Sequence, residues 1–143
     1  MNYFEGLAVG DTDSFGECEV TAEAVTDFAG QYDPQPIHTD PEAAASSMFG
    51  GLVASGWHTA AMTMRLLVDG WLTDSRALGA LGVDSLRWPE PVRPGDRLSV
   101  STEIREKEPF DEDRGRVAIE VATTTQHGDT VLSMVAQVLW ERR

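Results

Sequence analysis

Residues 56–71 read GWHTAAMTMRLLVDGW, and no other stretch of this 143-residue chain constrains the fold as strongly. The stretch is apolar almost all round, and its two charged residues, Arg65 and Asp69, come only near its end. This pattern is typical of a helix that is buried on most of its faces. Because the stretch is too short to cross a bilayer, it predicts a central helix covered by other parts of the chain.

Two shorter helices are predicted before it. Thr21 is a natural N-cap, and apolar residues follow at positions 25, 28 and 29 with helical spacing. This first helix should end near residues 30–32, because Pro34 and Pro36 disfavour helical geometry at the residues before them. Asp40 and Pro41 then supply the cap and the first position of a second short helix.

Strands are predicted on both sides of these helices. Five stretches have strand-like character: 13–20, 78–87, 97–106, 116–126 and 130–140. Turn-forming residues at 94–96, 111–115 and 127–129 separate the last four. Helices early and consecutive strands later favour an α+β fold, a single domain over residues 1–143 in which the central helix packs against an antiparallel sheet.

The segment from Asp33 to His38, DPQPIH, is the first candidate for chemistry. Its two prolines fix the backbone, so we expect a stiff loop that is extended rather than helical and brings both side chains to one water molecule. A carboxylate beside an imidazole can exchange protons near neutral pH. The alternative is structural: Asp33 caps a turn and His38 is a core histidine with its hydrogen bonds satisfied.

Gly56 is the second candidate. It follows Ser55 at the start of the central helix, where free N–H groups and the helix dipole favour negative charge. Lacking a side chain, it also allows close approach of a ligand carbonyl, although it can equally be a simple helix-start glycine. An acid–base pair plus an oxyanion donor, with no serine or cysteine nucleophile evident, indicates water chemistry on an activated carbonyl.

Residues 28–64, which include FAGQYDPQPIHTDPEAA and GLVASGWHT, resemble the hydratase motif of the MaoC-like dehydratase family, which includes the (R)-specific enoyl-CoA hydratases. The resemblance implies a hot-dog fold, in which a sheet wraps a central helix, and reversible hydration of a 2-enoyl-CoA. It implies that Asp33 and His38 activate the water and that the Gly56 N–H binds the thioester oxygen. It further implies a homodimer, or a higher oligomer, with active sites near the interface and no cofactor.

Three positions depart from the family pattern. Gln35 stands where the motif usually has Asn, and Ser55 where it often has His. A serine within the helix of well-studied relatives falls near Met64, beside Thr63. These departures leave the water-activating pair in place and concern the acyl-chain preference.

Two other functions remain open. A hot-dog thioesterase commonly carries an acidic residue on or near the central helix, but residues 56–68 contain no Asp or Glu. A non-catalytic subunit that only binds acyl thioesters has no need for both Asp33 and His38.

The net charge of -13 and the isoelectric point near 4.4 argue against a nucleic-acid partner, because such a field repels phosphate backbones. Lys107 is the only lysine, against ten arginines. A salt-rich cytosol and a codon bias towards arginine explain this equally well. Arg87 and Arg93 are candidates for contact with a CoA phosphate, although solvated arginines are the simpler interpretation.

The remaining titratable residues predict little chemistry. Cys18, the only cysteine, lies in a strand-like run, and disulfides within the chain are impossible. With no signal-peptide pattern or membrane-length apolar run, a cytoplasmic location is expected. No spacing of His38, Asp40 and His58 matches a metal site, so no metal is predicted. We expect His58 to be packed or at an interface and His127 to be solvated in a turn.

Overall fold

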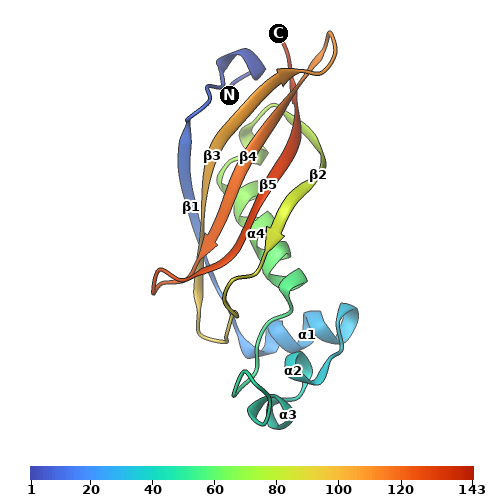
Figure 1. Ribbon diagram of the computed structural model, residues 1–143, viewed down its shortest axis with the longest axis vertical. Helices are drawn as coiled ribbons and strands as arrows, with labels where there is room; N and C mark the ends of the chain where they lie inside the picture. The colour runs from blue at the N-terminus through green and yellow to red at the C-terminus, as the bar shows by residue number, and fades with distance from the viewer.

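Five antiparallel strands form one sheet that curves along the helix α4 (Gly56–Gly70) in a computed structural model, which describes residues 1–143 (Figure 1). The order across the sheet is β1-β3-β4-β5-β2, so β1 and β2 are its edges. Their bounds are β1 Thr12–Glu19, β2 Ala77–Arg87, β3 Arg97–Pro109, β4 Arg114–Thr124 and β5 Thr130–Glu141. The predicted α+β arrangement, with five strands and a central helix, is confirmed.

The predicted and observed strand bounds differ most at the end of the third strand, while the fourth strand, predicted over 116–126, lies two residues earlier, at Arg114–Thr124. The pattern ended the third strand at residue 106, but β3 continues to Pro109, which lies opposite Gly115 of β4. The extra residues are mostly charged, which hid them from a hydrophobicity pattern. Pairing with β4 keeps them extended, and Arg116 of β4 lies within 4.0 Å of both Glu106 and Glu108.

The helix α4 packs one face against the sheet. Met62, Leu66 and Leu67 are buried there in the same apolar cluster as residues of β3, β4 and β5. A buried hydroxyl pair, Thr63 and Thr123, joins α4 to β4 with 2.7 Å between the two Oγ1 atoms. The other face of α4 is open, which corrects the prediction of a helix buried on most faces. Within one chain, the other elements therefore cover only part of the surface of α4.

Close contact between β1 and α4 depends on Gly16. Its φ of 88° lies in the left-handed region, and the pairing of β1 with β3 shifts register between Phe15 and Cys18. A side chain at this position would overlap a methyl group of Leu66. Glycine therefore allows both the backbone bend and the helix contact.

Three short helices gather at one end of the sheet, near the start of α4 (Figure 1). They are α1 (Ala22–Tyr32), α2 (Pro36–Thr39) and α3 (Pro41–Ala45). The Thr21 side chain accepts a hydrogen bond from Ala24 N, and that of Asp40 accepts from Glu42 N and Ala43 N, so both predicted caps are confirmed.

The helix α2 corrects the predicted conformation of residues 33–38. Residues 33–38 were expected to be extended, but the last three of them begin a helical turn that contains His38. Gln35 is extended, with φ -77° and ψ 143°, as a residue before proline should be. Pro36 occupies the first position inside the helix, where its missing N–H costs nothing.

A groove runs along the β2 edge of the sheet, between α4 and the strands β2, β4 and β5. Its volume is about 350 Å³, and 14 of its 16 lining residues are hydrophobic, including Met64, Leu67, Trp71, Leu78 and Val83.

Two short 3-10 helices, η1 (Phe4–Gly6) and η2 (Leu72–Asp74), complete the fold. None of the helices combines the length and the apolar character that a membrane crossing requires.

Candidate active site

A cleft of about 510 Å³ opens at the N-terminus of α4. Three segments form its walls: the turn between α1 and α2, the chain that leads into α4, and the connection from β2 to β3. The lining residues include all three predicted site residues, and they comprise Asp33, Gln35, His38, Met48, Phe49, Val53, Ala54, Ser55, Gly56, Trp57, Thr59, Trp88, Pro89, Glu90, Pro91, Val92 and Val131.

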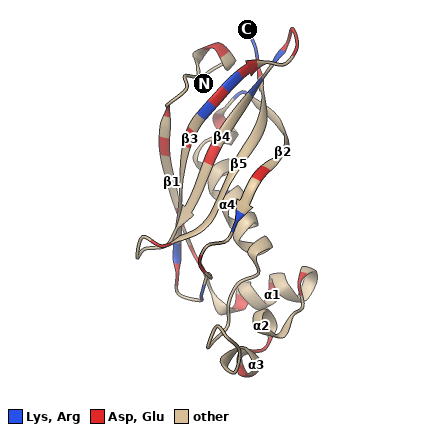
Figure 2. Ribbon diagram, in the orientation of Figure 1, with Lys and Arg blue, Asp and Glu red and all other residues tan.

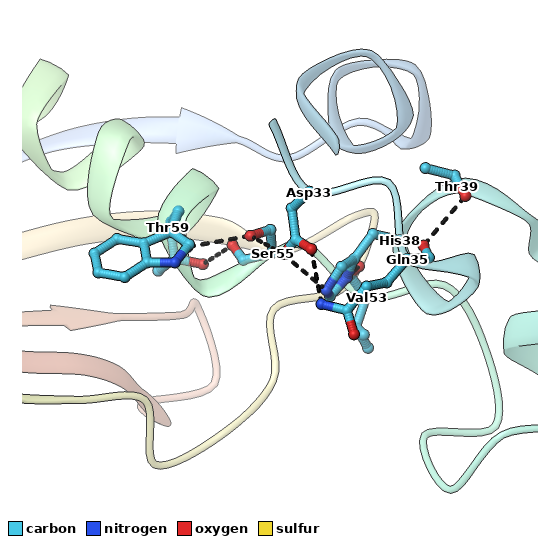
Figure 3. A network of polar contacts seen from close by, with 8 residues as sticks. Asp33, Gln35, His38, Thr39, Val53, Ser55 and Thr59 are labelled. Carbon is cyan, nitrogen blue, oxygen red and sulfur yellow. Dashed lines mark hydrogen bonds and ion pairs between the residues drawn. The ribbon is translucent and has the colours of Figure 1, made fainter. Parts of the chain in front are cut away.

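Asp33 and His38 face each other in this cleft (Figure 3). Asp33 follows the last turn of α1, and His38 lies in α2. The distance between Asp33 Oδ2 and His38 Nε2 is 3.4 Å, with side chains 18% and 8% exposed, respectively. The structure therefore brings the predicted pair together, although through a helical turn rather than an extended loop.

The orientation of the His38 ring is fixed by the chain before α4. Its Nδ1 lies 2.7 Å from the backbone oxygen of Val53. Because a carbonyl oxygen can only accept a hydrogen bond, Nδ1 must carry the proton in this contact. In the neutral ring, Nε2 is then an acceptor that faces the Asp33 carboxylate.

Two side-chain donors hold the Asp33 carboxylate (Figure 3). Gln35 Nε2 donates to Oδ1 at 2.7 Å, and Ser55 Oγ donates to Oδ2 at 2.7 Å. These bonds, first Gln35 and then Ser55, lower the pKa of Asp33 below its ordinary value. Partial burial opposes them, and the positive charge of the His38 ring, when that ring is protonated, lowers the pKa further. Asp33 is thus held in its ionised form.

Gly56 begins α4, and its N–H has no acceptor inside the helix. A side chain at this position would begin 2.5 Å from Cε2 of Trp88, so the indole ring packs directly on the glycine. The contact with Trp88 by itself requires a glycine at position 56, and it leaves the predicted role of the Gly56 N–H untested. Trp57 stands edge-on to the same indole, with ring centroids 5.2 Å apart.

The other histidines lie outside the cleft lining. His58 is buried on α4 and stacks on Phe28 with ring centroids 4.7 Å apart, which confirms a packed histidine. Burial lowers its pKa, and its Nδ1 has no hydrogen-bond partner. His127 is exposed in the turn before β5, as predicted.

The arginines divide into two groups. Seven of the ten lie within 4.0 Å of a carboxylate. Arg87, Arg93 and Arg143 do not, and the first two flank the segment 88–92 that lines the cleft. No group of three or more His, Cys, Asp or Glu side chains is placed to hold a metal ion.

The sequence pattern did not assign functions to three residues of this cleft. Ser55 and Gln35 were noted only as departures from a family motif, and Trp88 was given no role. The signals were present: serine is a common N-cap, and the tryptophan precedes proline. Their contacts with Asp33 and Gly56 depend on how distant segments meet.

Known proteins of one family are similar to this chain over most of its length. Residues 8–135 match the family model described as the MaoC like domain. The chain is 33% identical over 132 residues to a 3-hydroxybutyryl-CoA dehydratase from Methylorubrum extorquens, with 91% of this chain and 78% of that protein covered. It is 34% identical over 109 residues to 3-hydroxyacyl-thioester dehydratase Z from Mycobacterium tuberculosis, covering 75% and 71%.

Solved structures give the same result. A MaoC-like dehydratase from Rhodospirillum rubrum superimposes with a TM-score of 0.93 and 45% identity, covering 100% of this chain and 99% of that one. An R-hydratase from Pseudomonas aeruginosa superimposes with a TM-score of 0.76 and 26% identity, covering 99% and 86%. The hot-dog fold implied by the sequence is confirmed, and the chain belongs to the MaoC-like dehydratase family.

Proposed function

We propose that this protein is a hydro-lyase that reversibly hydrates a 2-enoyl thioester, with CoA as the carrier, to the 3-hydroxyacyl thioester. One observation carries the proposal: Asp33 and His38 converge at 3.4 Å in the cleft that begins α4, beside the unpaired N–H of Gly56. The named activities of the two dehydratases similar to this chain support the same reaction class.

The chemistry follows from the two facing acceptors. A water molecule can donate one hydrogen to His38 Nε2 and the other to Asp33 Oδ2, which leaves its lone pair free to attack C3. The C3–O bond forms as an O–H bond of the water breaks and its proton passes to the Asp33–His38 pair, while the alkene electrons move towards the thioester oxygen; the proton that C2 later receives comes from the same pair. The Gly56 N–H and the α4 dipole stabilise that oxygen, and a proton added at C2 completes the product. No cofactor takes part in this scheme.

Incubation of the purified protein with crotonyl-CoA tests the proposal. Loss of the enoyl absorbance without release of free thiol is the expected result. Release of free thiol would identify the thioesterase, the alternative that residues 56–68 disfavour because they contain no Asp or Glu. If neither signal appears with crotonyl-CoA or longer 2-enoyl-CoA esters, the non-catalytic binding subunit becomes the better explanation.

We also propose that the working form is a homodimer in which a second copy covers the groove beside β2. β2 is an edge strand, and its residues Leu78, Leu81 and Val83 are 54%, 54% and 46% exposed. An exposed apolar edge strand favours pairing with another strand. Of its residues only Asp84 and Arg87 are charged (Figure 2), so two copies of a chain with net charge -13 can meet there with little repulsion.

A further inference from the structure

Ser55 joins the acid–base pair to the helix that presents Gly56. Its side chain is 0% exposed, and its Oγ donates to Asp33 Oδ2, the carboxylate oxygen that faces His38 Nε2. Its backbone oxygen accepts from the N–H groups of His58 and Thr59, which fixes Ser55 to the first turn of α4. The position of this oxygen of Asp33 is therefore set by α4.

Capping alone does not account for this serine. Its Oγ also accepts from Trp57 N at 3.3 Å, a longer contact than the 2.7 Å bond to Asp33. A hydroxyl can accept one bond and donate another at the same time. An aspartate caps a helix equally well, but it would place a second carboxylate against Asp33 and offer no donor.

The second donor to Asp33 is less constrained. Gln35 is exposed, whereas Ser55 is fully enclosed between the turn after α1 and the start of α4. Solvent can substitute for the Gln35 amide once it is removed, but it cannot readily reach the position of the Ser55 hydroxyl. Ser55 is thus the donor whose loss the surroundings cannot replace.

We propose that Ser55 is a positioning residue for the hydration reaction, which fixes the Asp33 carboxylate relative to His38 and to the Gly56 N–H. The inference rests on the proposed function. It assigns to Ser55 no contact with the substrate: the hydroxyl acts through Asp33, by orienting one of its oxygens and by keeping it ionised.

Few other ionisable groups line the cleft and could change the pKa of Asp33. Among the residues that line the cleft, α2 contributes His38 and the connection from β2 to β3 contributes Glu90, while α4 contributes no ionisable group. The hydroxyl stabilises the ionised carboxylate, so its removal raises the pKa of Asp33. If catalysis needs ionised Asp33, the acid limb of the pH profile of kcat must then move to higher pH.

The test compares Ser55→Ala with the wild-type protein on crotonyl-CoA across the acid pH range. We expect kcat to fall about ten- to hundredfold, the factor that corresponds to one lost hydrogen bond to a charged group, with a smaller change in KM. The acid limb should move to higher pH. Ser55→Thr, which keeps the hydroxyl, should recover most of the activity and return the limb to its original position.

Two further variants separate positioning from capping. Thr21→Ala removes the N-cap of α1, a contact of 3.1 Å, without touching Asp33, so it should lower the melting temperature and leave the acid limb in place. Ser55→Gly, which retains much of the capping preference but has no hydroxyl, should move the limb as Ser55→Ala does. Should the Ser55 variants behave like Thr21→Ala, the hydroxyl is only a cap and the proposal is wrong.

A measurement without turnover keeps this inference distinct from the proposed function. In protein with ¹³C-labelled aspartate, the carboxyl signal of Asp33 can be assigned from its disappearance in Asp33→Asn. Its titration midpoint should be higher in Ser55→Ala than in the wild type. An unchanged midpoint overturns the positioning role, even if the wild-type protein hydrates crotonyl-CoA. If the midpoint is raised in Ser55→Ala but the wild-type protein has no hydratase activity, the effect of Ser55 on Asp33 stands and the proposed reaction is wrong.

Discussion

In the cleft at the start of α4, the polar side chains of Asp33, His38 and Ser55 all have partners in the same chain. In the groove farther along α4, the apolar side chains Met64 and Val83 remain 48% and 46% exposed. Both hollows share one helix, yet one chain satisfies the polar groups of the first and leaves the second uncovered. From this difference we expect residues of the cleft to control the chemistry and residues of the groove to control the assembly of two chains.

The largest expected effect concerns the cleft. Asp33→Asn and His38→Ala should each lower turnover of the true substrate by about 10²–10⁴-fold, the usual contribution of a general acid or base. Both variants should remain folded, since neither side chain belongs to the apolar core, although His38→Ala should lower the melting temperature because it leaves the Val53 oxygen unpaired. Steady-state kinetics and thermal unfolding on the same samples check both statements. Near wild-type turnover in both variants would remove the basis for the proposed mechanism.

The next effect concerns assembly. Val83→Lys places a charge in the groove and should convert the dimer to a monomer of 15.6 kDa at micromolar concentration, as measured by light scattering. Val9→Lys is the matched control, because Val9 is 61% exposed and lies outside the groove. The control should remain dimeric. A wild-type protein that is already monomeric would show that one chain tolerates the open groove.

A smaller effect is expected at the rim of the cleft. Arg93 is exposed and has no carboxylate partner, so Arg93→Gln should raise KM for an enoyl-CoA by up to about fivefold, the upper range of a surface ion pair. KM for the same enoyl group on a phosphate-free thioester should not change. Arg65→Gln provides the control, since Arg65 pairs with Asp69 on the exposed face of α4. Equal effects on both esters would mean that Arg93 does not recognise phosphate.

The smallest effect concerns the whole acidic surface, which the cleft and the groove share. With net charge -13 per chain, and more in a dimer, the melting temperature should rise from low salt to about 1 M salt, where the screening length falls to roughly 3 Å. A chloride series measured by thermal unfolding checks this. A flat or falling curve would favour codon bias as the origin of the acidity over adaptation to a salt-rich cytosol.

Local sequence patterns predicted much of the fold. The central helix and the five strands could be found because hydrophobic period and turn residues are properties of short segments. The full length of β3 could not, because its charged end is extended only through pairing with β4. The turn α2 was missed because two prolines suggested an extended loop, whereas Pro36 suits the first position of a helix.

The site was predictable to a similar degree. Asp33 and His38 are close in sequence, so a short stiff segment was enough to predict that their side chains meet. The predicted conformation of that segment, an extended loop, was wrong. The bond from Ser55 to Asp33 joins residues 22 positions apart, and Trp88 reaches Gly56 from the connection after β2. Contacts of this kind depend on the path of the whole chain, which no local pattern contains.

The placement of Lys107 has a consequence for chemical side reactions. A thioester acylates free amines and thiolates, so a protein that holds one risks modifying itself. The only lysine of this chain instead lies 4.5 Å from the centre of the Phe4 ring, against η1 at the end of the sheet opposite the three short helices (Figure 1). The only thiol, Cys18, lies in β1 outside the cleft lining, and burial raises its pKa. An activated acyl group bound in the cleft would therefore meet no lysine or cysteine, and amine-directed coupling to a surface at Lys107 would leave the cleft facing the solvent.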